Sequence, residues 1–165
     1  MSLGDDSSSA VDFQTMRGRD YPTIRQFTVF LENRVGVLLG IIRRFRGTEV
    51  KIVALNINDS SECCVVRLIL SAPEQGRELL ERAGLAMIES DLIAVELPDN
   101  DQPLLEVCAA LLRAEINLIQ TYPLMLRNAG RMAVAIMVDN IDQAQTTLAA
   151  EGLRMITEND LLDMC

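Results

Sequence analysis

Two short stretches of the chain, GLAMI at residues 84–88 and GLRMI at residues 152–156, are identical except at their third residue. Each follows a segment with helical periodicity and leads into an apolar run. Around them the chain shows one order of elements twice: strand, helix, strand, strand, helix, strand. A repeated order of six elements indicates two small domains of the same fold, joined with almost no linker.

The first half begins with a partly alternating stretch at 24–32, which predicts a half-buried strand. From Val37 the apolar residues recur at helical spacing and predict a helix with a core-facing stripe, formed by Leu38, Ile41, Ile42 and Phe45. Segments 50–57 and 63–71 are rich in β-branched residues and predict a hairpin, and Pro73 opens a helix that Gly84 ends. A strand at 85–90 completes the unit.

The second half repeats this order with a strand at 92–98 and a helix at 102–115. We expect the apolar residues of that helix to face inward, namely Leu104, Leu105, Cys108, Leu111 and Leu112. A hairpin of 116–126 and 131–138, a helix at 141–152 and a strand at 153–159 follow. The predicted organisation is a flexible tail at 1–22, a first domain at 23–91, a second at 92–160 and a C-terminal tail at 161–165, with the domains fixed side by side.

The charge of the chain narrows its partners and its location. The 24 acidic and 15 basic side chains give a net charge of −9, which disfavours nucleic acid and anionic membrane surfaces. No apolar run has the roughly 20 residues needed to span a bilayer, and the start lacks the pattern of a secretory signal. The expected location is cytoplasmic, where the four cysteines stay reduced.

Catalysis has little support in the residues. The chain has no histidine, the commonest general base and metal ligand. The adjacent Cys63 and Cys64 lack the spacing of a zinc site. Glu89, Asp91 and Glu96 can serve as an acid–base pair or bind a hard cation, but a solvated acidic face is the more frequent explanation. We therefore expect no enzyme activity, no metal and no cofactor.

The junction between the first strand and the first helix, Glu32-Asn33-Arg34-Val35-Gly36-Val37-Leu38-Leu39, resembles the Asn-x-Pro-Gly motif of ACT domains, with Val35 in place of proline. The hairpin NDSSECCVVRLIL and the junction SDLIAVELPD are similar to those of tandem ACT proteins. The resemblance covers nearly everything after residue 22. It implies an α+β fold of two ferredoxin-like βαββαβ domains, each an antiparallel four-stranded sheet with two helices on one face.

The two halves depart from the ACT pattern in opposite ways. In the second half the family's Asp-x-Pro-Gly becomes Asp99-Asn100-Asp101-Gln102, so proline and glycine are both absent. After the first helix of each half, Asn117 matches the family's Gly-Ile-Asn-Ile, whereas the first half has Lys51 there. The resemblance therefore allows either two sites or one composite site, with the glycine loop from the first domain and Asn117 from the second.

The chemistry of the junction suits an amino acid. Free N–H groups at a helix start favour a carboxylate, and Gly36 allows close approach to the backbone. Asn33 can hold an ammonium or a carboxylate group, and Arg34 can pair with an acidic group. The alternatives are ordinary structural roles: Asn33 as a helix cap, Arg34 as a solvated turn residue, Lys51 as a sheet-edge charge, and Asn117 bound to backbone at a helix exit.

The resemblance predicts a non-catalytic regulator that binds a small amino acid between domains or subunits and acts on a partner enzyme of amino-acid metabolism. It also implies a homodimer. One alternative is a protein similar to the regulatory subunit of acetolactate synthase, which responds to branched-chain amino acids. The other is an ACT scaffold that has lost ligand binding.

Overall fold

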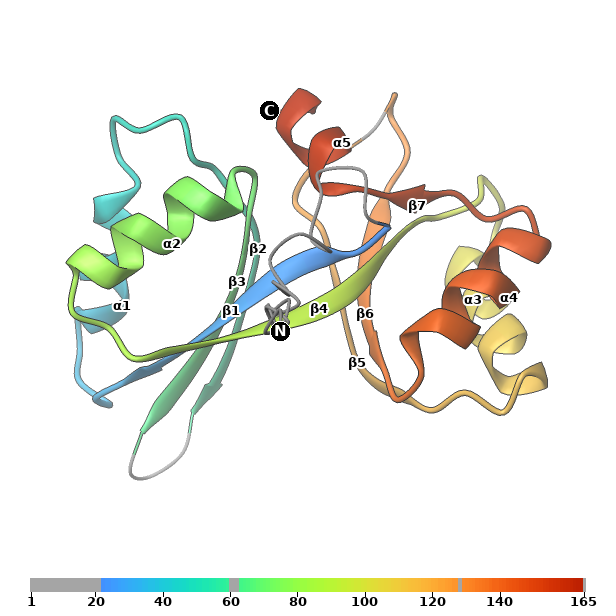
Figure 1. Ribbon diagram of the computed structural model, residues 1–165, viewed down its shortest axis with the longest axis horizontal. Helices are drawn as coiled ribbons and strands as arrows, with labels where there is room; N and C mark the ends of the chain where they lie inside the picture. Colours follow the sequence, from blue (N-terminus) through green and yellow to red (C-terminus); the bar gives the residue numbers. More distant parts are fainter. Residues whose placement is uncertain (1–21, 60–62, 128, 165) are drawn as a thin grey trace, which may run out of the picture.

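The computed structural model describes residues 22–59, 63–127 and 129–164. Its first half contains β1 (Ile24–Leu31), α1 (Val37–Arg44), β2 (Ile52–Asp59), β3 (Cys64–Leu70) and α2 (Pro73–Arg82). The second half contains α3 (Pro103–Arg113), β5 (Leu118–Pro123), β6 (Ala133–Val138), α4 (Ile141–Ala150), β7 (Met155–Ile156) and α5 (Glu158–Asp163). The strand β4 (Met87–Glu96) joins the halves (Figure 1). Of the tail predicted at 1–22, residues 1–21 lie outside the described residues.

The two halves have the same sheet topology. All pairings are antiparallel, in the order β2-β3-β1-β4 in the first half and β5-β6-β4-β7 in the second. Gly84 and Gly152 end α2 and α4 with similar positive φ angles of 70° and 75°. The fold is therefore a pair of ferredoxin-like units, as the repeated order of elements predicted.

The strand β4 belongs to both units. Residues Met87 to Leu92 pair with β1, and residues Ile93 to Glu96 pair with β6. We predicted two separate strands here, at 85–90 and 92–98, but the structure has one continuous strand. The pairing partner changes within one residue of the predicted domain boundary at 91/92. The boundaries themselves stay a prediction.

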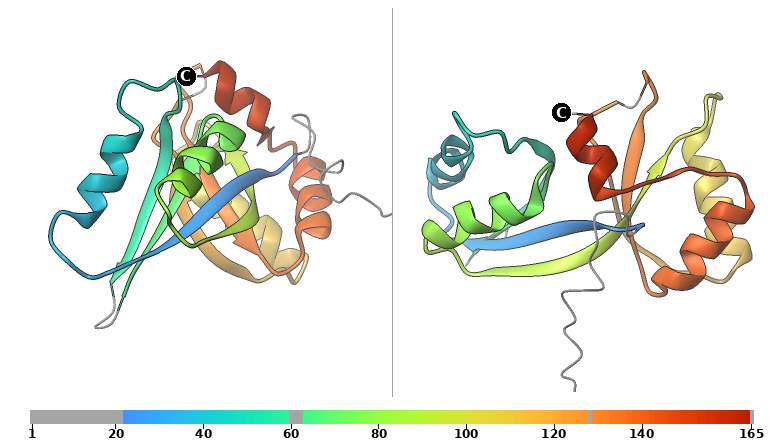
Figure 2. Two further views of the ribbon diagram at one scale, coloured as in Figure 1. Left: turned by 60° about the vertical axis from the view of Figure 1, so that its left-hand side comes forward. Right: turned by 45° about the horizontal axis from the view of Figure 1, so that its top comes forward.

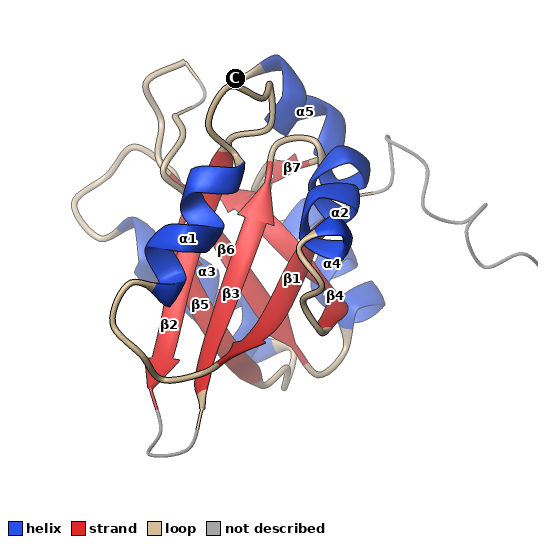
Figure 3. Cartoon of the chain, turned by 90° about the vertical axis from the view of Figure 1, so that its left-hand side faces the viewer, coloured by secondary structure: helices blue, strands red, loops and turns tan. Residues whose placement is uncertain are grey.

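The open faces of the two sheets pack against each other, with the helices outside. Helices α1 and α2 cover one outer face and α3 and α4 the opposite one (Figures 1 and 3). The central cluster takes residues from both sheets, among them Ile24, Val53 and Ile69 from the first and Tyr122, Ala135 and Ile156 from the second. The two units therefore lie against each other through their sheets, because these strands carry apolar residues on both faces and bury both.

Polar contacts also cross between the two sheets. The Tyr122 hydroxyl donates a hydrogen bond to Oε1 of Gln26, and the Met125 N–H donates to the Val53 carbonyl at 2.7 Å. Burial raises the pKa of the Tyr122 hydroxyl above its ordinary value. A buried hydroxyl needs a partner, and Gln26 supplies one from the other unit.

Two sequence expectations are wrong in the second half. Helix α3 buries Val107, Ala110 and Leu111, whereas three of the leucines expected inside are exposed: Leu104, Leu105 and Leu112. The last strand stops at Ile156, because the next residues form α5, which begins with a capping box between Thr157 and Asp160. Part of the predicted C-terminal tail, 161–163, is thus helical, and the side chain of Leu161 lies in the central cluster.

Candidate functional site

The junction between β1 and α1 presents an open helix start. Gly36 is the N-cap of α1, in the left-handed conformation with φ 89°, and no side chain caps the helix. A Cβ at this position would meet no atom within 4 Å. The backbone conformation therefore favours glycine here, and the space beside its Cα is open. The N–H of Val37, the first residue of α1, donates to the Arg34 carbonyl at 3.3 Å.

The residues before Gly36 are exposed, and two of them have acidic partners. The Asn33 side-chain amide donates to Oδ1 of Asp59 at 2.7 Å, and Arg34 pairs with Glu32 at 2.7 Å. Val35 is fully exposed. The capping role considered for Asn33 is wrong, because α1 begins at Val37 and Gly36 occupies the cap position.

Lys51 and Asn117 occupy the same place in the two units, directly before β2 and β5. The backbone N–H of Lys51 donates to the Ser71 hydroxyl at 2.9 Å, and that of Asn117 donates to Oδ1 of Asp139 at 3.1 Å. In return, each carbonyl accepts a backbone N–H, from Ser71 at 3.0 Å and from Asp139 at 3.3 Å. Both side chains are exposed.

The second loop, Asp99 to Gln102, is closed by its own side chains. Asn100 accepts the N–H of Gln102 at 3.0 Å through Oδ1 and donates to Glu106 in the first turn of α3. All four loop residues are exposed. Like α1, α3 has no side-chain cap, but its N-cap is Gln102 in place of the family's glycine, and Pro103 follows at its first position.

One chain does not bring the candidate residues together. The β1–α1 junction lies at the outer end of the first unit, and the α3–β5 connection with Asn117 lies at the outer end of the second (Figures 1 and 2). A composite site of Gly36 and Asn117 is therefore not formed within a single copy of the chain.

The comparisons with known proteins agree with this architecture. Residues 22–165 match the family described as an ACT domain pair. The chain belongs to this family. No curated protein matches it by sequence. Among solved structures, protein BT0572 from Bacteroides thetaiotaomicron has a TM-score of 0.76 at 21% identity, covering 85% of this chain and 96% of that one.

Two structures of enzyme subunits are less similar to this ACT domain pair. The regulatory subunit of aspartate kinase from Thermus thermophilus has a TM-score of 0.56 at 12% identity, covering 82% of this chain and 94% of that one. The acetolactate synthase small subunit from Thermotoga maritima has a TM-score of 0.32 at 8% identity, covering 81% and 92%. The first likeness shows a shared fold, and the second is too weak to carry an argument.

Sequence reasoning missed a charged cluster that joins the two ACT units. The Arg25 side chain, 4% exposed, pairs with Glu158 at 2.7 Å and with Glu74 at 2.7 Å. Burial opposes the charge of Arg25, but hydrogen bonds and the charges of Glu158 and Glu74 outweigh it and raise its pKa. An arginine inside an apolar strand was the available signal, because a buried charge needs partners.

The acidic residues near the junction of the units are paired with arginines. Glu89 pairs with Arg77 at 2.6 Å, and the buried Glu96 pairs with Arg131 at 3.1 Å and Arg154 at 3.6 Å. The solvated face expected for Glu89 and Glu96 is therefore wrong. Within the part of the chain that the structure describes, no group of three acidic or cysteine side chains is arranged to hold a metal ion.

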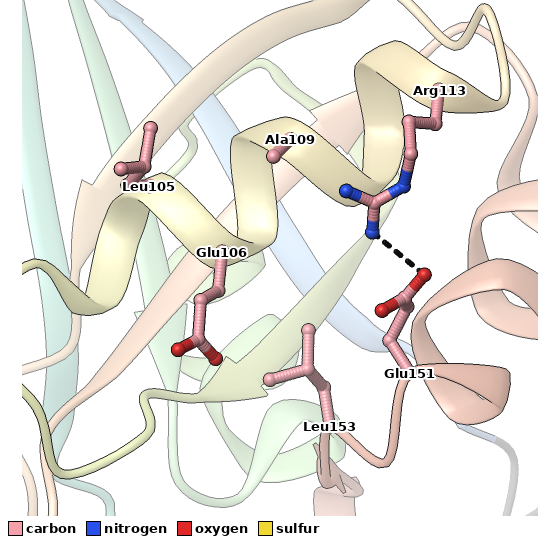
Figure 4. A pocket seen from close by; sticks show the side chains of 6 residues that line it. All are labelled: Leu105, Glu106, Ala109, Arg113, Glu151 and Leu153. Atoms are coloured by element: carbon pink, nitrogen blue, oxygen red, sulfur yellow. Dashed lines mark hydrogen bonds and ion pairs between the residues drawn. The ribbon is translucent and has the colours of Figure 1, made fainter.

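Two pockets lie outside the predicted site. One, of about 360 Å³, lies between α3 and the end of α4, where Leu105, Ala109 and Arg113 follow one face of α3 (Figure 4). The Arg113 guanidinium forms an ion pair with Glu151 at 2.7 Å across this pocket. The other, of about 540 Å³, lies between α2 and α5. No helix in the described segments is long and apolar enough to cross a membrane.

Proposed function

We propose that this ACT domain pair is a non-catalytic cytoplasmic regulator, which binds a small amino acid between two copies of the chain and signals to a partner enzyme of amino-acid metabolism. The observation that supports this most is the open start of α1. The Val37 N–H donates to the Arg34 carbonyl at 3.3 Å, while no side chain caps the next N–H groups of α1, in a family of paired domains. Those groups suit the carboxylate of an amino acid.

A second copy of the chain supplies what one copy lacks. The junction at Gly36 is exposed and lines neither of the two pockets described above. A small ligand needs a concave site that buries most of its surface. Placing the α1 side of one copy against the α3 side of another would bring Gly36 towards Asn117 and enclose the ligand between them.

The exposed faces of the two outer helices support such pairing. Leu39 on α1 is 49% exposed, and Leu105 and Leu112 on α3 are 64% and 77% exposed. In the sheet order β2 and β5 stand at the two ends, but they contact each other within the chain, where the Met125 N–H donates to the Val53 carbonyl. The support for pairing therefore comes from the helix faces, because exposed apolar faces are common in subunit contacts. The pairing is a homodimer if two copies close symmetrically on each other.

The partner is proposed from the class of related structures. The fold is shared with the regulatory subunit of aspartate kinase, which is a subunit of an amino-acid biosynthetic enzyme. A ligand that contacts both copies would stabilise one arrangement of them, and a bound enzyme would respond to that arrangement.

Loss of ligand binding is the second candidate, and the second loop favours it for one unit. Gln102 stands at the N-cap of α3 in place of the family's glycine, and Asn100 bonds to Glu106 beside this helix start. We therefore propose one kind of site, at the Gly36 junction, in place of two. A protein that functions like an acetolactate synthase regulatory subunit stays an alternative for the identity of the partner.

A thermal-shift screen of the purified protein against the twenty amino acids tests the proposal. A ligand that binds only the folded state raises the melting temperature. Val35→Asp places a carboxylate beside the open helix start on a fully exposed side chain, so it should abolish the shift without loss of stability. Met125→Asp, also exposed, adds the same charge elsewhere and should keep it. No shift with any amino acid favours the scaffold.

A further inference from the structure

The pocket between α2 and α5 is built from both ACT units. Its volume is about 540 Å³, within the range of small-molecule sites. The first unit supplies Arg25, Ser71 and the start of α2, and the second unit supplies Glu158, Asn159 and Leu162 from α5. Anything bound here contacts both units at once.

Two of the polar groups that line the pocket are held in place by burial. The side chain of Arg25 is 4% exposed, and Ser71 is 1% exposed. The guanidinium donates through Nε and Nη2 to the two oxygens of Glu158, at 2.7 and 3.0 Å, and through Nη1 to Glu74 at 2.7 Å. The wall therefore has a fixed geometry before any ligand arrives.

The lining carries more negative than positive charge. The lining residues include the carboxylates of Glu49, Glu74 and Glu158 and one guanidinium, that of Arg25, while Glu74 also pairs with Arg77 at 3.6 Å. The guanidinium already has three hydrogen bonds to carboxylates, so little of its charge is left for an anionic ligand. Glu49 lines the pocket and is exposed, so its carboxylate can meet an incoming cation. The net charge of −9 of the whole chain adds to this preference.

Apolar and hydroxyl groups complete the wall. Leu162 and Pro73 give aliphatic surface beside the carboxylates, and the Ser71 oxygen accepts the Lys51 N–H at 2.9 Å. From this combination we infer that the pocket binds a small organic cation, a primary ammonium group on a short aliphatic chain. This site is independent of the proposed amino-acid site at Gly36, and its ligand holds α5 against the first unit.

The experiment is a titration of the full chain with 1,4-diaminobutane, followed by calorimetry and by amide NMR shifts. We expect saturable binding of one molecule per chain, with shifts at Ser71, Gln75 and Leu162. Succinate, a dianion of similar length, should not bind. Glu49→Gln should weaken binding about tenfold, the loss expected when one hydrogen bond to a charged group disappears.

Glu78→Gln is the matched control. It changes the net charge equally, and Glu78 is exposed on α2 and pairs with Arg82 at 3.2 Å, outside the pocket. Equal weakening by both variants would show binding by general charge and overturn the assignment, as would no binding or tighter binding of succinate. The affinity of the pocket for 1,4-diaminobutane should not change with protein concentration, because the pocket lies within one copy of the chain. The proposed amino-acid site lies between two copies, so a failure to bind the diamine would leave that proposal untouched.

Discussion

Arg25 in β1 and Glu158 in α5 form a two-armed ion pair between residues 133 positions apart in the chain. Nε to Oε1 measures 2.7 Å and Nη2 to Oε2 measures 3.0 Å. Both side chains are largely buried, with exposed fractions of 4% and 12%. The pair fastens the C-terminal helix of the second unit to the first strand of the first unit, so the two halves are joined at β4 and again at α5.

Glu158→Ala should destabilise the protein by about 3 kcal/mol, because it leaves the buried guanidinium with fewer acceptors. The measurement is the free energy of unfolding from urea denaturation. Glu78→Ala breaks an exposed pair and should cost about 0.5 kcal/mol or less. Equal losses in the two variants would mean that Arg25 is well compensated by Glu74 and by Glu89, whose Oε2 lies 3.9 Å from its Nη1.

Gly36→Ala should destabilise the protein by about 1 kcal/mol, since φ 89° is unfavourable for a residue with a Cβ. Gly40→Ala, inside α1, should stabilise it by about 0.5 to 1 kcal/mol, because alanine is the better helix former. In both places the added methyl group meets no atom within 4 Å, so packing is not involved. Thermal denaturation measures both effects: the melting temperature should fall for Gly36→Ala and rise for Gly40→Ala. A change in the same direction for both variants would contradict the prediction.

Much of the fold could be predicted from the sequence, because periodicity and turn residues act locally. Gly84 and Gly152 end their helices as the repeated stretch indicated, and the β1–α1 junction was located correctly. The packing of one sheet on the other was not predicted. It depends on residues such as Tyr122 and Gln26, which meet only in the folded chain.

The exposure and contacts of individual side chains were harder to predict than the helices and strands. The leucines of α3 follow helical spacing, yet Leu105 and Leu112 are exposed, since periodicity does not say which of two apolar stripes faces the core. The contacts of Arg25 were missed because its partners Glu74 and Glu158 are distant in sequence. Whether Asn33 and Gly36 bind a ligand is still a proposal.

The docking of α5 should depend on pH through Asp160. Burial raises the pKa of this carboxyl, but hydrogen bonds from the backbone and hydroxyl of Thr157 and the charge of Arg154 outweigh it, so the pKa lies below its ordinary value of 3.8. Because the pKa of Asp160 is lower in the folded chain than in the unfolded chain, the ionised carboxylate stabilises the fold above pH 3.8. This stabilisation is lost as the pH falls from there through the folded pKa. The protection factors of the α5 amides, which correct hydrogen exchange for its intrinsic rate at each pH, should therefore fall below about pH 4. Asp160→Asn should remove the step.

The pairing of two copies should depend on the exposed leucines of α3. Leu112 is 77% exposed, so Leu112→Glu leaves the folded monomer intact while placing a charge in the proposed contact. If this residue lies at the centre of the interface, its loss costs about 2 kcal/mol, a roughly 30-fold weaker association. Sedimentation over a range of protein concentrations measures this change.

Leu162→Glu is the control for that measurement. Leu162 is 42% exposed on α5, away from α1 and α3, so the same change of side chain should leave the association constant unaltered. A chain that stays monomeric at all concentrations would exclude a site shared by Gly36 and Asn117, because a single copy keeps these residues at opposite ends. An amino acid that still bound such a monomer would then have to use another surface.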